Sequence, residues 1–112
     1  MKILAFGCAF LIFVAVICSS TIRAANSGSA LYRFRCAHCH ADDGSGNTEA
    51  RKKMKVPDLR EKKYIDMSDQ ELFDSIGHGK NHKEYPHAFL HTGMNDDDVS
   101  QIIAHLRTLQ KK

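Results

Sequence analysis

The feature that most constrains this chain is the motif Cys36-Ala37-His38-Cys39-His40. Two cysteines separated by two residues, with a histidine directly after the second, are the attachment signature of a c-type haem. Each thiol adds to one vinyl group of the porphyrin, and three residues of helical rise bring both sulfurs to one face. His40 then directs its imidazole at the iron from the proximal side. The motif predicts one covalent haem c, held by Cys36 and Cys39, with His40 as a metal ligand.

Two other chemistries share a Cys-x-x-Cys pair, namely zinc binding and thiol–disulfide exchange. Cys36 and Cys39 together with His78 and His82 have spacings that suit a tetrahedral metal, but the gap between the pairs is far longer than in compact zinc domains. A thiol–disulfide exchanger is expected to show a βαβ pattern, and no stretch of this chain alternates with a period of two. Haem attachment is therefore the leading hypothesis.

The first 24 residues have the composition of a secretory signal peptide. Lys2 is followed by an almost wholly apolar run from Ile3 to Cys18 and then by small residues, with expected cleavage after Ala24. The run is short for a membrane span, which needs about 20 residues, so an uncleaved anchor is the alternative. We expect an exported, periplasmic protein whose domain spans residues 25–112, with membrane association only if the N-terminal segment stays attached.

Removing this segment changes the composition of what remains. Lys2 and Arg23 are lost, which leaves 14 basic and 13 acidic side chains, so no nucleic-acid footprint is expected. Cys8 and Cys18 are lost as well, and the motif then holds the remaining cysteines in an oxidising compartment. An 88-residue domain has a marginal core, to which a large apolar ring adds buried area.

The periodicity of the domain predicts an all-α fold with three main helices. The first spans residues 27–35, with Ala30, Leu31 and Phe34 at helical spacing and Gly28 offering a close approach for another helix. A short helix is expected from Thr48 to Met54. The second main helix follows the capping-box sequence Ser68-Asp69-Gln70-Glu71 and ends near Gly77 and Gly79. The third begins after Asn95 and carries one apolar stripe, formed by Val99, Ile102, Ile103, Leu106 and Leu109.

Over nearly the whole of residues 25–112, the chain resembles the small monohaem class I cytochromes c. The segments that carry the resemblance are Gly28–Tyr32, Cys36–Gly46, Met54–Leu59, Ser68–Ile76, Gly79-Lys80 and Ala104–Leu109. The resemblance implies that the first and last helices cross and that the haem lies in a crevice with one edge exposed. It also implies that the Pro57 carbonyl accepts a hydrogen bond from the other nitrogen of His40.

The activity that this resemblance implies is single-electron transfer, by a carrier rather than an enzyme. The expected partners are redox proteins, such as a dehydrogenase, a reductase or an oxidase. The alternative is a haem sensor or a peroxide-reactive haem protein, whose sixth coordination position is open or weakly ligated.

The chain departs from the family pattern on the distal side of the haem. Members usually carry a methionine followed by proline between the last two helices, and Tyr85 precedes Pro86 here. Met94 is the later methionine, but its place before Asn95 also suits a hydrophobic staple at the start of a helix. The histidines of the same region are His78, His82, His87 and His91, of which His82 and His87 are the leading candidates. The distal ligand stays open among Met94, a histidine, Tyr85 and no protein ligand.

Overall fold

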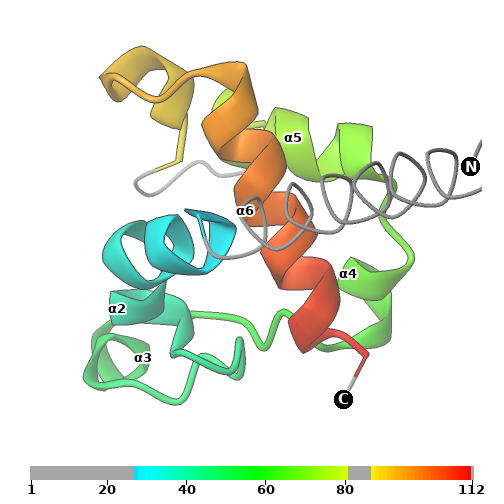
Figure 1. Ribbon diagram of the computed structural model, residues 1–112. Coiled ribbons are helices and arrows are strands. Elements are labelled where there is room, and N and C mark those ends of the chain that lie inside the picture. Colours follow the sequence, from blue (N-terminus) through cyan, green and yellow to red (C-terminus); the bar gives the residue numbers. More distant parts are fainter. Residues whose placement is uncertain (1–26, 81–86, 112) are drawn as a thin grey trace, which may run out of the picture.

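The computed structural model describes residues 27–80 and 87–111 of the chain (Figure 1). The expected signal peptide and the candidate ligands His82 and Tyr85 lie outside these residues. The boundary between signal peptide and domain therefore stays a prediction.

The described residues form helices and loops without a strand, which confirms the all-α prediction. Three helices dominate them: the segment 27–35, hereafter the first helix, then α5 (Asp69–Gly77) and α6 (Asp96–Leu109). The shorter elements, each of one or two turns, are α2 (Ala37–His40), α3 (Glu49–Lys53), α4 (Lys62–Ile65) and the 3₁₀ helix η1 (Phe89–Thr92). The expected helix at 48–54 is α3, whereas α4 and η1 were not predicted, since neither is long enough to show an apolar period.

Both long helices of the second half begin with a capping box. The Ser68 side chain accepts from the Glu71 N–H while the Glu71 carboxylate accepts from the Ser68 N–H. Asn95 and Asp98 make the same reciprocal pair at the start of α6. These bonds satisfy N–H groups that no helical carbonyl reaches, which fixes where each helix begins.

Replacing Asn95 with alanine should lower the free energy of unfolding by about 1 kcal/mol, because the Asp98 N–H loses its acceptor. Chemical denaturation of the haem-bound protein measures this change. Ser100→Ala is a control on the exposed face of the same helix. An unchanged unfolding midpoint in Asn95→Ala would contradict the capping role.

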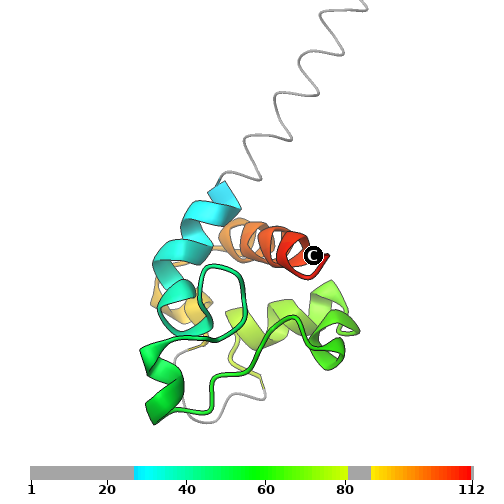
Figure 2. The same cartoon turned by 90° about the horizontal axis from the view of Figure 1, so that it is seen from below.

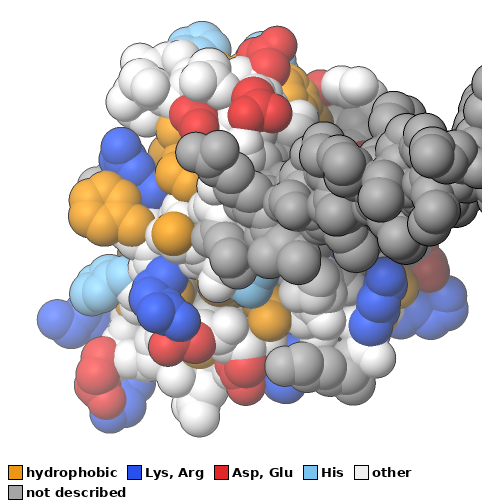
Figure 3. Space-filling view, viewed as in Figure 1, with side chains coloured by type: hydrophobic (Ala, Val, Ile, Leu, Met, Phe, Trp, Pro, Cys, Tyr) orange, Lys and Arg blue, Asp and Glu red, His pale blue; other side chains and the backbone are white. Residues whose placement is uncertain are grey.

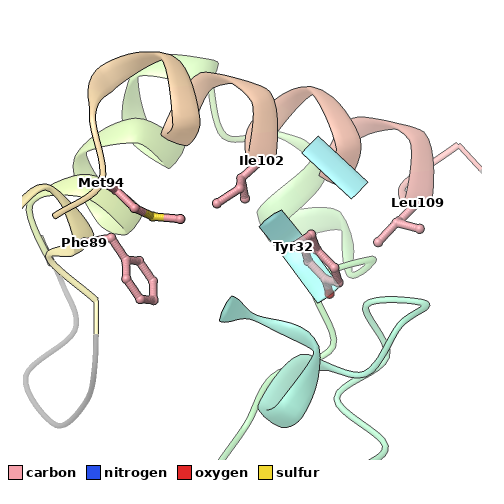
Figure 4. Close-up of a cluster of buried hydrophobic side chains, with 5 residues drawn as sticks. All are labelled: Tyr32, Phe89, Met94, Ile102 and Leu109. Atoms are coloured by element: carbon pink, nitrogen blue, oxygen red, sulfur yellow. The ribbon is translucent and has the colours of Figure 1, made fainter. Parts of the chain in front are cut away.

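The apolar stripe of α6 is buried along its whole length, as predicted. Its residues contribute to two neighbouring clusters, and Ile76 of α5 packs against both. One contains Val99, Ile103 and Leu106 with Leu72 of α5. In the other, Ile102 and Leu109 pack with residues outside α6, and Figure 4 shows Phe89 and Met94 near the start of the helix and Tyr32 towards its end. Helix α6 is therefore the element on which the other segments assemble.

The first helix crosses α6 (Figures 1 and 2). The residue of the first helix at the crossing is Gly28, which has no side chain. A Cβ atom on Gly28 would lie 2.2 Å from the Gln101 carbonyl oxygen and 3.4 Å from the His105 Cβ atom. Backbone therefore meets backbone at this crossing. The close approach predicted for Gly28 is confirmed.

The inner face of the first helix differs from the one that its apolar residues predict. Phe34 is 79% exposed, and Ala30 is exposed as well. Tyr32 is buried instead, at 2% exposure, and its ring packs against the His105 ring. The helix turns Gly28 and Tyr32, which are four residues apart, towards α6. Of the three apolar residues at helical spacing, Leu31 packs partly buried against the core, whereas Ala30 and Phe34 do not, because Gly28 and the hydrogen-bonding Tyr32 make the closer contact.

Arg107 near the end of α6 joins that helix to the segment before α5. Its guanidinium donates to the Asp69 carboxylate at 2.9 Å, to the Ile65 carbonyl at 3.2 Å and to the Met67 carbonyl. These bonds hold the 65–69 turn against the last helix. None of the helices that the structure describes is both long enough and apolar enough to cross a bilayer.

Candidate haem-binding site

The cysteine–histidine motif is held in place by its own backbone and by two hydroxyl groups. The Cys36 N–H donates to the Tyr32 carbonyl at 2.7 Å, so the motif continues directly from the first helix. The Tyr32 hydroxyl donates to the Ala41 carbonyl at 3.0 Å, and the Thr48 hydroxyl donates to the Cys39 carbonyl at 2.8 Å. Both bonds end on carbonyl groups at the C-terminal end of α2, and they brace the turn there.

The loop after His40 packs closely against Pro57. Gly46 has a φ of +67°, and its N–H donates to the His40 carbonyl at 2.8 Å. A Cβ atom on Gly46 would lie 2.8 Å from the Pro57 carbonyl oxygen, so only glycine fits between these two segments. The predicted neighbour Pro57 is thus brought to the His40 side of the site.

A pocket of about 350 Å³ opens beside this motif. Cys36, His40 and Pro57 form part of its wall, and His87 contributes to it from a distant part of the sequence. The remaining wall is mostly apolar and comes from every main helix; it consists of Tyr32, Leu59, Lys63, Tyr64, Met67, Leu72, Ser75, Ile76, Phe89, Ile102 and Leu106.

The donor set and the shape of this pocket fit a haem. The Cys36 thiol and the His40 imidazole meet mostly apolar walls, and Cys39 belongs to the same helical turn, which is the surrounding that a covalent porphyrin needs. Burial and the neighbouring Cys39 thiol raise the pKa of Cys36 to about 12, although the positive charge of Arg35 lowers it in part. The Cys36 thiol of this fold is therefore protonated at neutral pH.

His40 and His87 are neighbours in the pocket wall. Their ring centroids are 6.1 Å apart and their planes differ by 15°. The Nδ1 atom of each ring, the nitrogen nearer the backbone, is buried. The His87 ring also contacts Phe89, with centroids 5.9 Å apart. The structure therefore brings one of the two leading histidine candidates to the proximal histidine.

The other described candidates lie elsewhere. Met94 is buried in the cluster with Phe89 and Ile102 and is absent from the pocket wall. His78 and His91 are exposed and pack edge to face on each other. Among the described residues, no three histidine, cysteine or acidic side chains gather as metal ligands.

Two further histidines, His38 and His105, are not part of the pocket wall. His38, between the cysteines, is exposed, and His105 is partly buried against Tyr32. The Tyr32 contribution to the site was not predicted. Its spacing of four residues from both Gly28 and Cys36 was the available signal, since that spacing places all three on one side of a helix.

An all-helical domain folded around a Cys-x-x-Cys-His motif and an apolar pocket defines a monohaem c-type electron-transfer protein. The model of the cytochrome c family matches residues 25–110, and the chain belongs to that family. Membership implies covalent haem c, haem-based electron transfer and redox protein partners, and members are typically carriers rather than enzymes. A search of curated proteins found no match.

Proposed function

We propose that this protein is a single-electron carrier that works between redox partners outside the cytoplasm. The observation that carries the proposal is that Cys36 and His40 of the attachment motif line a mostly apolar pocket of about 350 Å³. In this proposal Cys36 and Cys39 hold the haem through thioether bonds, and His40 is the proximal ligand. Pro57, on the same wall, orients His40 through its carbonyl oxygen.

The bound haem supplies one-electron chemistry between ferric and ferrous iron. In this proposal the residues around the haem move little during electron transfer. Tyr32 and Thr48 brace the motif through hydroxyl bonds, while Leu72 and Ile102 exclude water from two sides of the pocket. The apolar wall and the fixed ligands set the reduction potential of the haem, and no conformational change is required.

The proposal of export is supported by the sequence, and the proposal of protein partners is supported by the surface. The charge pattern of residues 1–24 supports a secretory signal peptide, and cleavage would release a soluble carrier. Figure 3 shows charged side chains of both signs interspersed on the visible face. Such a surface suits transient contacts with protein partners, which use charge for orientation more than for affinity.

The test is a redox titration of the full chain expressed with haem-maturation machinery. A red protein that titrates as one reversible one-electron couple, and that neither binds carbon monoxide rapidly nor consumes peroxide, is the expected result. Rapid gas binding or peroxide turnover by the ferrous or ferric protein would favour the sensor or peroxide-reactive alternative and overturn the carrier proposal.

A further inference from the structure

We infer that His87 is the distal ligand of the haem iron, opposite His40, in place of the methionine usual in this family. The inference rests on the haem attachment proposed above, and it concerns only the sixth coordination position. It is carried by the position of the two rings in the pocket and by the way the backbone fixes His87.

The spacing of the two rings matches that of a metal held between them. A metal–imidazole bond of about 2 Å and a ring radius of about 1.1 Å put the centroids of two opposed imidazoles roughly 6.2 Å apart. The His40 and His87 centroids are 6.1 Å apart, with nearly parallel planes. Both side chains line the same pocket. The separation of the two centroids is therefore the one expected when a single metal ion joins the two imidazoles.

The backbone of His87 is anchored to the end of α5. The N–H of the next residue, Ala88, donates to the Ile76 carbonyl at 3.0 Å. Gly79 allows this approach, since its own Cβ atom would lie 3.3 Å from the Ala88 Cβ atom and 3.6 Å from the His87 carbonyl carbon. Ala88 has a φ of +77°, which is rare for a residue with a side chain. Such a conformation persists only where the surrounding structure enforces it.

Met94 is held in a different role. It is 7% exposed and packs with Phe89 and Ile102, and its N–H donates to the Phe89 carbonyl at 3.1 Å. It also directly precedes Asn95, whose side chain caps α6. Drawing the Met94 sulfur to the iron would open this cluster and disturb the cap. The sequence alone left Met94 and His87 as alternatives, and these contacts favour His87.

Two imidazole ligands predict a property that separates this carrier from methionine-ligated relatives. Methionine raises the reduction potential of a c-type haem, so replacing it with histidine lowers the potential. We expect the ferric protein to be low-spin and to lack the weak far-red charge-transfer band that sulfur on iron produces.

The experiment compares ferric spectra and potentials of the full-chain protein with those of His87→Ala, His87→Met and Met94→Leu. His87→Ala should become high-spin, and added imidazole should restore the low-spin spectrum. His87→Met should gain the far-red band with a higher potential. Met94→Leu should keep the spectrum of the parent protein. His91→Ala is the matched control, because His91 is an exposed histidine four residues away.

An unchanged low-spin spectrum in His87→Ala would overturn the inference, as would a far-red band in the parent protein that Met94→Leu removes. In both cases haem staining on a denaturing gel would still report covalent attachment, so the proposed function would stand. A parent protein without covalent haem would overturn both.

Discussion

The double variant Cys36→Ala, Cys39→Ala should carry no covalently bound haem. Both thioether sulfurs are removed, and no other described cysteine lies in the chain to replace them. Expression with haem-maturation machinery, followed by haem staining on a denaturing gel, measures the result directly. The expected loss is complete, because the apolar walls of the pocket hold a porphyrin only by contacts that denaturation removes.

The control for this variant lies inside the same motif. His38→Ala alters an exposed residue between the cysteines and should leave haem staining unchanged. Each single cysteine variant should retain one thioether and therefore a weaker stain. Haem that still migrates with the double variant on a denaturing gel would refute the attachment residues.

Gly28→Ala should destabilise the protein by roughly 3 kcal/mol or more, which is large for the addition of one methyl group. At an exposed helical position the same change stabilises by about 1 kcal/mol, so the direction of the effect is itself diagnostic. The difference arises because the new Cβ atom would lie 2.2 Å from the Gln101 carbonyl oxygen, and backbone cannot move aside as a side chain can. Thermal unfolding should show a midpoint lowered by roughly 12 °C or more.

Ala30→Leu is the matched control for Gly28→Ala. It adds a larger side chain to the same helix two residues away, at an exposed position. We expect its unfolding midpoint to stay close to that of the parent protein. A stable Gly28→Ala variant would show that the first helix does not cross α6 at Gly28.

Two of the helices that the sequence predicted, α5 and α6, have starts that are specified by local sequence. Ser68 with Glu71, and Asn95 with Asp98, lie three residues apart, so a capping box can be recognised without knowing any tertiary contact. The apolar stripe of α6 could be predicted in the same way, because its residues recur at helical spacing within one segment. The attachment motif was found for the same reason, since its five residues are contiguous.

The features that sequence reasoning missed depend on contacts between distant segments. The inward face of the first helix is chosen by the Gly28 crossing and by the Tyr32 hydroxyl, and neither adds to an apolar period. The position of His87 depends on Ile76 and Gly79, which fix the backbone of Ala88. The sequence left His82 and His87 as the leading histidine candidates, and the fold brings His87 next to His40.

The arrangement of the pocket along the chain has a consequence for assembly. Cys36 and Cys39 lie near the beginning of the domain. Ile102 and Leu106, which form part of the pocket wall, belong to the last helix. A porphyrin joined to the early segment stays with the chain while the later walls form. Contact between the porphyrin and the later walls of the pocket thus becomes an intramolecular step. The effective concentration of the porphyrin at those walls is in the range of about millimolar. The proposed thioether bonds would thus secure the cofactor before the pocket is complete.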